Sequence, residues 1–269
     1  MEFSRVSNAL PPRPALRDAC TELAEAAARE IMRIYAGDVV VHDKADKSPL
    51  TEADGAAEAV ILAGLRQLTP GTVIIAEEEV ASGRVPSLND SPFWLVDPLD
   101  GTKEFIKRNG EFTVNIALIE DGRPTLGIVL APATGTLWRG VAGLGADKRV
   151  GSGAFHPITT RPSPADGLTA VGSRSHGSED DLERWFRENN LNVTNRVPAG
   201  SSLKFCLVAE GKADVYPRLA PTCEWDTAAG QAVLEAAGGE VVTVDNRPLT
   251  YGHPPFLNPH FIARSKTAR

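Results

Sequence analysis

The sequence of 269 residues contains few cysteines and no closely spaced cysteine pair. Its three cysteines, Cys20, Cys206 and Cys223, are widely separated and odd in number. This pattern argues against a disulfide framework, and it provides no zinc or redox motif of the CxxC type. We therefore expect a protein of a reducing compartment, and we place it in the cytoplasm.

The chain also lacks a long apolar run and a basic run. No segment is long enough to span a bilayer, and the N-terminus has no apolar core of the signal-peptide type. The formal net charge is −7, and no patch interleaves basic with aromatic residues. We therefore expect neither a membrane nor a nucleic acid as partner, so an anionic ligand would need a local cationic cluster or bound cations.

The balanced composition is that of an ordinary soluble globular protein. The length allows one large domain or two packed halves, and no internal repeat or low-complexity tract is present. The region 142–167 is rich in Gly, Pro and Ser, which makes it the best candidate for a boundary. We expect two halves, residues 1–160 and 161–269.

Hydrophobic periodicity predicts a mixture of helices and strands. Three strand-like runs separated by turn signals predict an antiparallel meander: 112–120, 125–131 and 136–141. The other predicted strands are 72–76, 93–96, 169–172, 213–216, 240–244 and 261–264. The predicted helices are 16–35, one following Asp54, a short one from Lys103, 179–189, one from the segment 200–204 through Ala209, and 224–236.

The most informative stretch is the end of the apolar run Phe93 to Val96. It leads into Asp97-Pro98-Leu99-Asp100-Gly101-Thr102. Two carboxylates at the end of a buried strand must be paired, hydrogen-bonded or bound to metal, because desolvating them is costly. Mg²⁺ prefers oxygen ligands and often lies between carboxylates and a phosphate.

Two interpretations of this stretch stay open at the level of local spacing. Asp100 or Thr102 could cap a helix after an Asp-Gly turn, which is a common structural arrangement. Alternatively, Gly101 allows the chain to turn sharply, so that the following amides face an anion at a helix start.

Three other acidic sites also lie at the ends of predicted elements. Asp54 follows Thr51 by three residues and resembles a capping box, but it could also orient a hydroxyl or a water. Glu77-Glu78-Glu79 follows the strand 72–76 and could be a solvated loop or part of an acidic cleft. Asp226 is expected in the first turn of a helix, where the macrodipole favours an acid.

The second half supplies polar and cationic residues at predicted loops and helix starts. The loop 173–176 ends in His176, and Ser201 or Ser202 is a plausible N-cap before Lys204. Arg218 is expected in a loop after the strand 213–216. Together with four acidic sites, these residues point to a functional cleft.

These residues carry a resemblance to a known family. Asp97-Pro98-Leu99-Asp100-Gly101-Thr102 resembles the DP(I/L)DGT motif, and Trp225-Asp226-Thr227-Ala228 resembles the WDxA motif, of the Mg²⁺-dependent, lithium-sensitive phosphatases typified by inositol monophosphatase. The segments 48–54 and Glu77-Glu78 follow the family order, and the resemblance covers nearly the whole chain. It implies a layered αβαβα sandwich of α+β and α/β character, with an antiparallel sheet in the first half.

The resemblance also implies roles for individual residues. The implied Mg²⁺ ligands, for two or three ions, are Glu77, Asp97, the main-chain carbonyl of Leu99, Asp100 and Asp226. Thr102, hydrogen-bonded to Asp54, would hold and help deprotonate the attacking water. The implied substrate-binding residues are Gly101, Thr102, His176, Ser201, Lys204 and Arg218.

Within the family, the segments 200–206 and 216–218 are most similar to the 3′(2′),5′-bisphosphate nucleotidase branch. This implies hydrolysis of the 3′-phosphate of adenosine 3′,5′-bisphosphate, and of its 5′-phosphosulfate analogue, in sulfur metabolism. The alternatives are an inositol monophosphatase or other small sugar-phosphate phosphatase, and a non-catalytic nucleotide or metal sensor. The small phosphorylated nucleotide is the expected partner, and the protein would be a monomer or homodimer.

Overall fold

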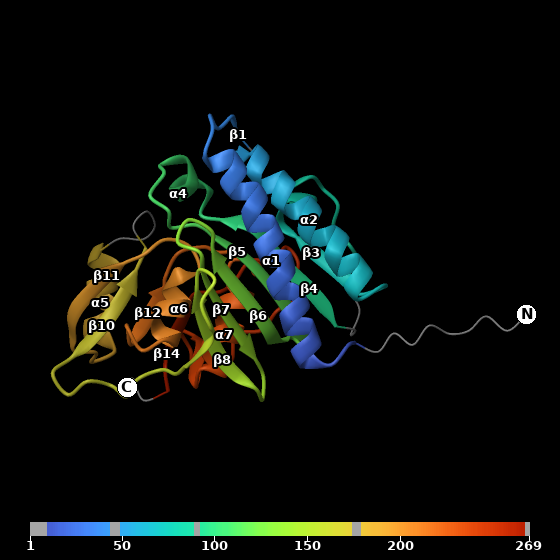
Figure 1. The fold of residues 1–269 in the computed structure, drawn as a ribbon. Helices are drawn as coiled ribbons and strands as arrows, with labels where there is room; N and C mark the ends of the chain where they lie inside the picture. The colour runs from blue at the N-terminus through green and yellow to red at the C-terminus, as the bar shows by residue number, and fades with distance from the viewer. Residues whose placement is uncertain (1–9, 44–48, 89–91, 174–178, 267–269) are drawn as a thin grey trace, which may run out of the picture.

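The computed structural model describes residues 10–43, 49–88, 92–173 and 179–266, which form layers of helices and sheets. Two sheets carry most of the strands, and a third is the hairpin of β1 (Val41–Asp43) and β2 (Pro49–Thr51). Helices cover both faces of the larger sheet (Figure 1).

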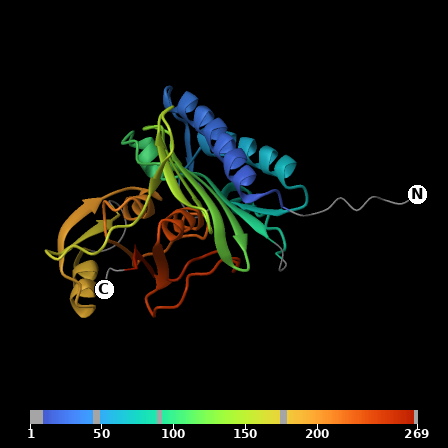
Figure 2. The ribbon, with the colours of Figure 1, turned by 60° about the horizontal axis from the view of Figure 1, so that its bottom comes forward.

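Two helices form the outer layer on one face of the larger sheet. They are α1 (Arg13–Tyr35) and α2 (Glu52–Leu68), which lie side by side (Figures 1 and 2). Their apolar positions pack on the sheet, with Leu16, Ile31 and Ile61 fully buried. The predicted capping box of α2 is present, because Thr51 caps the helix and Asp54 accepts from the Thr51 amide.

The larger sheet has seven strands among the described residues, in the order β3-β4-β5-β6-β7-β8-β9. Only β3 and β4 pair in parallel; the other neighbours are antiparallel and include the predicted meander. The strands are β3 (Val73–Ala76), β4 (Phe93–Asp100), β5 (Thr113–Glu120), β6 (Arg123–Ala131), β7 (Thr136–Val141), β8 (Gly145–Val150) and β9 (His156–Ile158). Two short helices flank β4: α3 (Glu77–Ala81) and α4 (Thr102–Ile106).

The next layer consists of α6 (Leu203–Ala209) and α7 (Ala228–Ala236), which pack between the two sheets. Glycines in the larger sheet allow α7 to approach closely. A Cβ on Gly127 would lie 2.4 Å from the Ala229 carbonyl oxygen, and one on Gly140 would lie 2.4 Å from the Val233 Cα. This contact anchors α7 and the loop before it against the sheet that carries Asp97 and Asp100.

The smaller sheet has the order β11-β10-β12-β14-β13 and mixes parallel and antiparallel pairs. Its strands are β10 (Leu168–Gly172), β11 (Val193–Pro198), β12 (Val215–Arg218), β13 (Gly239–Thr243) and β14 (Phe261–Ser265). The fifth layer is α5 (Glu179–Glu188), whose Phe186 packs on Val215 and Ile262. The predicted αβαβα sandwich is confirmed.

Several elements differ from the sequence predictions. β1, β2, β8, β9 and β11 were not predicted, and two of them lie inside the Gly-, Pro- and Ser-rich region 142–167. Glu77, Glu78 and Glu79 form the first turn of α3 rather than a loop. The helix begins directly after β3, and the Glu58 carboxylate accepts a hydrogen bond from the Glu78 amide at 2.9 Å. The division at residue 160 stays a prediction.

Candidate active site

A bulge in β4 brings Asp97 and Asp100 to the same face of the larger sheet. Asp97 is opposite Asn115 and Asp100 is opposite Thr113, so four residues of β4 lie opposite three of β5. Asn115 and Thr113 are two residues apart and so lie on one face of β5, which puts their partners Asp97 and Asp100 on that face too. Leu99 packs on the opposite face, in the core beneath α1 and α2. Pro98 suits this bulge because it has no amide to donate to the ladder.

The turn after Asp100 depends on a glycine. Gly101 has a φ of +92°, and a Cβ there would lie 3.1 Å from the Glu111 carbonyl oxygen and 3.3 Å from the Ser201 Cβ. No larger residue fits this left-handed backbone without strain. Neither Asp100 nor Thr102 caps α4; its N-cap is Gly101, without a side-chain cap. The turn delivers Thr102 toward α2.

Thr102 contacts two acceptors. Its Oγ1 lies 3.3 Å from Asp54 Oδ1 and 3.3 Å from the Leu99 carbonyl oxygen. The other Asp54 oxygen accepts from the amide and the hydroxyl of Thr51, both at 2.7 Å. Asp54 is therefore both a helix-capping residue and the partner of Thr102, so the two interpretations of its position are compatible.

Asp226 lies in the turn before α7 rather than in the first helical turn, because the N-cap is Thr227. Its carboxylate accepts from the Cys223 amide at 2.8 Å, which closes a tight turn. Glu224, which is 1% exposed, accepts from the amides of Gly252 and His253 and fixes this turn to the segment before β14. The predicted macrodipole role of Asp226 is therefore wrong.

The acidic groups raise one another's pKa. Burial raises the pKa of Asp97 well above its usual range, and the carboxylates of Glu77, Asp100 and Asp226 add to the shift. Asp97 and Glu77 also share a hydrogen bond, which two ionised carboxylates cannot make. Asp100 and Asp226 open onto the cavity, but burial still raises the pKa of Asp100 to about 6 and that of Asp226 to about 8. Such a cluster needs protons or cations to balance its charge.

Two buried cations lie opposite these acids. Lys204 is 5% exposed, and its Nζ donates to the Ser201 carbonyl oxygen at 2.5 Å and lies 5.4 Å from the centre of the Tyr216 ring. Burial lowers the pKa of Lys204 to about 8. Arg218 ends β12 rather than lying in a loop, and it donates to the carbonyl oxygens of Ala220 and Pro221.

Ser202, one of the two predicted N-cap residues of α6, occupies the N-cap position but makes no side-chain cap bond. Its hydroxyl donates instead to the Asp226 carbonyl oxygen at 2.7 Å. Ser201 has a φ of +44°, and its Oγ lies 3.2 Å from Thr113 Oγ1. A non-glycine residue in this conformation is held by its surroundings and often marks a functional site.

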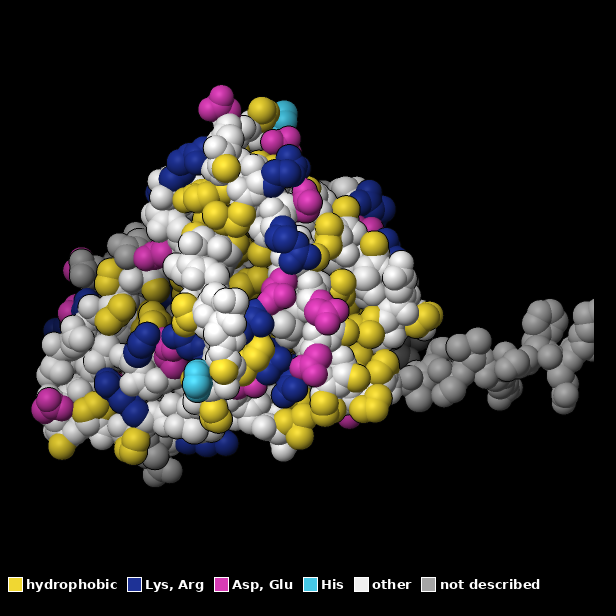
Figure 3. All heavy atoms as spheres, viewed as in Figure 1, with side chains coloured by type: hydrophobic (Ala, Val, Ile, Leu, Met, Phe, Trp, Pro, Cys, Tyr) yellow, Lys and Arg dark blue, Asp and Glu magenta, His cyan; other side chains and the backbone are white. Residues whose placement is uncertain are grey.

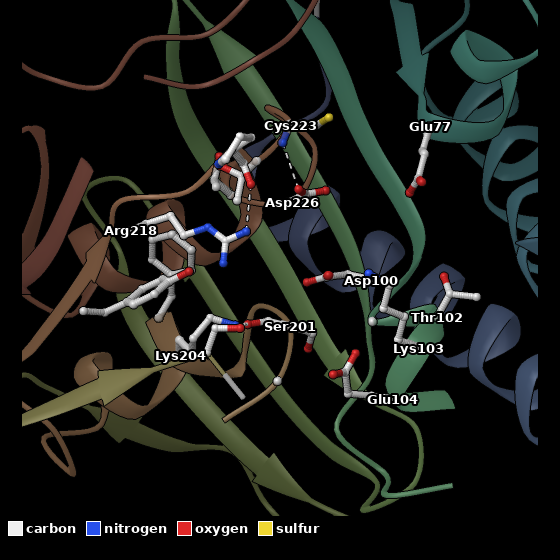
Figure 4. A pocket seen from close by; sticks show the side chains of 18 of the residues that line it. Glu77, Asp100, Thr102, Lys103, Glu104, Ser201, Lys204, Arg218, Cys223 and Asp226 are labelled. Carbon is white, nitrogen blue, oxygen red and sulfur yellow. Dashed lines mark hydrogen bonds between the residues drawn. The ribbon is translucent and has the colours of Figure 1, made fainter. Parts of the chain in front are cut away.

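These residues surround one cavity of about 390 Å³. Figure 4 shows the carboxylates of Asp100, Asp226 and Glu77 on one side and the side chains of Arg218 and Lys204 on the other. The cavity lining includes most of the predicted site: Glu77, Asp100, Gly101, Thr102, Ser201, Lys204, Arg218 and Asp226. Asp54 and Asp97 are each 1% exposed and lie behind the lining.

The chemistry of the donors fits Mg²⁺. Carboxylate and carbonyl oxygens are the ligands that hard divalent cations prefer, and the carboxylates of Glu77, Asp100 and Asp226 are near enough to Asp97 to raise its pKa. Within the described ranges, no three acidic, histidine or cysteine side chains already converge as a ready set of ligands.

The predicted substrate-binding residue His176 is outside the described residues. On the face shown in Figure 3, Lys and Arg side chains are interspersed with Asp and Glu rather than gathered in one basic area. No helix within the described ranges is long and apolar enough to cross a membrane.

Sequence reasoning missed three buried residues that hold the site together: Asn115, Ser202 as a partner of Asp226, and Glu224. The available signal was a polar residue inside an apolar strand, since Asn115 interrupts the run from Val114 to Ile119. An uncharged amide at such a position requires hydrogen-bond partners when it is buried.

Comparison with known proteins agrees with this fold. Residues 15–267 match the inositol monophosphatase family. The chain belongs to this family, as its two acidic motifs predicted. Among curated proteins, it is 45% identical over 249 residues to the 3′(2′),5′-bisphosphate nucleotidase CysQ of Escherichia coli strain K12, covering 91% of this chain and 97% of that protein.

Solved structures show the same relationship. CysQ from Bacteroides thetaiotaomicron, a bacterial member of the inositol monophosphatase family, superposes with a TM-score of 0.78 at 38% identity, covering 94% of this chain and 97% of that chain. The inositol monophosphatase from Anabaena sp. PCC 7120 has a TM-score of 0.72 at 28% identity, covering 94% and 92%.

Proposed function

We propose that this chain is a metal-dependent 3′(2′),5′-bisphosphate nucleotidase. It hydrolyses the 3′-phosphate of adenosine 3′,5′-bisphosphate to give AMP and inorganic phosphate. The curated relatives that match over nine-tenths of the chain carry this activity in their names. The structural observation that supports the same choice is a cavity with acids at one end and two buried cations at the other.

The acidic end receives the phosphate that is cleaved. Glu77, Asp97, Asp100, Asp226 and the Leu99 carbonyl oxygen would hold two or three Mg²⁺ ions. Divalent cations at these ligands supply neutralisation of the phosphate charge and acidify the attacking water. Gly101 and Thr102 start a helix beside this end, where main-chain amides favour an anion.

Thr102 and Asp54 position the attacking water and accept its proton. The Thr102 hydroxyl has one proton, and of its two acceptors the Asp54 carboxylate is the stronger. The lone pairs of the Thr102 oxygen can then accept a hydrogen bond from the attacking water. As the water oxygen forms its bond to phosphorus, the water gives a proton to the Thr102 oxygen and Thr102 gives its own proton to Asp54. The bond from phosphorus to the ribose 3′-oxygen breaks, and that oxygen takes up a proton from solvent.

The cationic end receives the second phosphate. Lys204 and Arg218 are buried, and both donate to carbonyl oxygens. Two desolvated cations that repel each other are costly, and the 5′-phosphate of the nucleotide would supply a negative charge to both. Ser201 and His176 complete the proposed substrate-binding set.

A comparison of substrates tests the proposal. We expect Mg²⁺-dependent phosphate release with a higher kcat/KM for adenosine 3′,5′-bisphosphate than for adenosine 3′-monophosphate, which lacks the second phosphate, and for inositol 1-phosphate. The 5′-phosphosulfate analogue should also be hydrolysed. Preference for inositol 1-phosphate would make the chain an inositol monophosphatase, and no turnover of any of the four would favour a sensor.

A further inference from the structure

A buried chain of hydrogen bonds connects β5 with the start of α6 and with Asp226. We call it the Asn115 relay; its members are Thr113, Asn115, Ser201 and Ser202. Thr113 and Asn115 are fully buried and lie two residues apart on β5, so both point toward the second half. Each contacts one of the two serines: Thr113 contacts Ser201 at 3.2 Å, and Asn115 donates to Ser202 at 3.0 Å.

The direction of each hydrogen bond in the relay can be assigned. The Asn115 amide nitrogen lies 3.5 Å from a carboxylate oxygen of Asp100, which only accepts, so the Asn115 oxygen faces Thr113. Thr113 therefore donates its one hydroxyl proton to Asn115 at 3.1 Å. Ser202 accepts from Asn115 and uses its own proton on the Asp226 carbonyl oxygen at 2.7 Å. Because the Thr113 proton is used on Asn115, Ser201 donates to Thr113 at 3.2 Å. The Ser202 hydroxyl also hydrogen-bonds the Asp100 carboxylate, which lowers the pKa of that group.

The relay touches both halves of the acidic site. Asp100 belongs to β4 of the larger sheet, whereas Asp226 belongs to the turn before α7. The amide of Asn115 contacts Asp100, and the main-chain amide of Ser202 also donates to the Asp100 carboxylate. Ser202 in turn holds the Asp226 main chain. Two aspartates far apart in sequence are thus set at a fixed separation by one amide and one hydroxyl.

We propose that Asn115 is a positioning residue that acts through Ser202 to fix the separation of Asp100 and Asp226, and thereby the affinity for divalent cations. This inference rests on the proposed function only in naming these aspartates as cation ligands. Asn115 is fully buried and does not line the cavity, so it touches no substrate; of the relay, only Ser201 reaches the lining. Hydrogen-bond partners that orient metal ligands typically change metal affinity by about 10- to 100-fold when they are removed.

The test measures cation binding without turnover. Mg²⁺ is titrated calorimetrically into the wild type, Asn115→Ala, Ser202→Ala and the double variant, in the absence of substrate. We expect each single variant to bind Mg²⁺ about 10-fold or more weakly. The double variant should bind no more weakly than the worse single variant, because both changes break one relay. At saturating Mg²⁺, KM should stay near the wild-type value.

Thr69→Val is the matched control, because it removes a buried hydroxyl that accepts from Trp94 at the opposite end of β4 from Asp100. It should lower stability and leave Mg²⁺ affinity unchanged. Wild-type Mg²⁺ affinity in both relay variants, or fully additive losses in the double variant, would overturn the proposal. If the wild type failed to hydrolyse the nucleotide while the relay variants lost Mg²⁺ affinity, the proposed function would fall and the relay would stand.

Discussion

The hydroxyl of Thr102 lies 3.3 Å from the carboxylate of Asp54, a residue 48 positions earlier in the chain. The two belong to different layers: Asp54 is in the first turn of α2, and Thr102 begins α4 at the end of β4. Thr51 holds the other Asp54 oxygen with two hydrogen bonds, so the carboxylate presents its remaining oxygen to Thr102. A helix cap thereby orients a proposed catalytic pair.

The first prediction concerns this pair. Thr102→Val keeps the shape of the side chain but removes the hydroxyl that accepts from the water, and it should lower kcat about 10²- to 10⁴-fold. KM should change little, because the substrate contacts remain. Steady-state kinetics of phosphate release provide the measurement. Thr102→Ser retains the hydroxyl and should stay close to wild type; equal losses in both variants would contradict the role of the hydroxyl.

The second prediction concerns stability without metal. Unfolded aspartates ionise near pH 4, whereas Asp100 and Asp226 in the folded protein keep their protons up to pKa values of about 6 and about 8. The folded state therefore binds more protons in this interval. Its stability is greatest at low pH within the interval and is lost as pH rises through these values.

Thermal unfolding in a chelator should show this loss as a Tm that falls between about pH 5 and about pH 8.5. Adding Mg²⁺ should raise Tm most at the high end, because cations replace the missing protons there. Asp226→Asn removes the carboxyl group whose pKa is about 8 and should flatten the profile. If the Tm of the wild type in chelator is constant or rises over this range, Asp100 and Asp226 do not keep their protons in the folded protein as described.

The third prediction concerns the second phosphate. Burial lowers the pKa of Lys204 to about 8, so Lys204 loses its charge as pH rises through that value. The KM for adenosine 3′,5′-bisphosphate should then rise, whereas the KM for adenosine 3′-monophosphate should not. Lys204→Arg stays charged and should remove the difference in pH dependence. Parallel KM profiles for the two substrates in the wild type would speak against a phosphate at Lys204.

The fourth prediction separates the two ends of the cavity. Lys204→Ala and Arg218→Ala should each raise KM more for adenosine 3′,5′-bisphosphate than for inositol 1-phosphate, because only the former carries a second phosphate. Mg²⁺ affinity should be retained, since neither side chain supplies an oxygen ligand. Equal effects on both substrates would remove the argument for a nucleotide-specific second half.

Much of this arrangement could be predicted from the sequence. Asp97, Asp100 and Gly101 follow an apolar run directly, and the cost of burying two carboxylates indicates a site wherever the strand ends. The helical and alternating periods located most helices and strands. These patterns involve residues that are close in the sequence, so they can be recognised without knowledge of tertiary contacts.

The parts that could not be predicted depend on contacts between distant residues. The β4 bulge is visible only in the pairing with β5, and it decides that Asp97 and Asp100 share a face. Ser202 reads as a helix cap, but the Asp226 carbonyl oxygen captures its hydroxyl. β8 and β9 are short strands on the edge side of the larger sheet, within a glycine-rich segment whose composition favours turns.

The most direct test of the whole account is phosphate release from adenosine 3′,5′-bisphosphate by wild type and Asp97→Asn across a range of Mg²⁺ concentrations. The wild type should release phosphate only with Mg²⁺. Asp97→Asn should lose about 10³-fold or more in kcat/KM, because several kcal/mol of charge stabilisation is removed, while its Tm in chelator is retained. Turnover by Asp97→Asn at the wild-type rate, or wild-type turnover that persists in chelator, would contradict the proposed metal-dependent reaction.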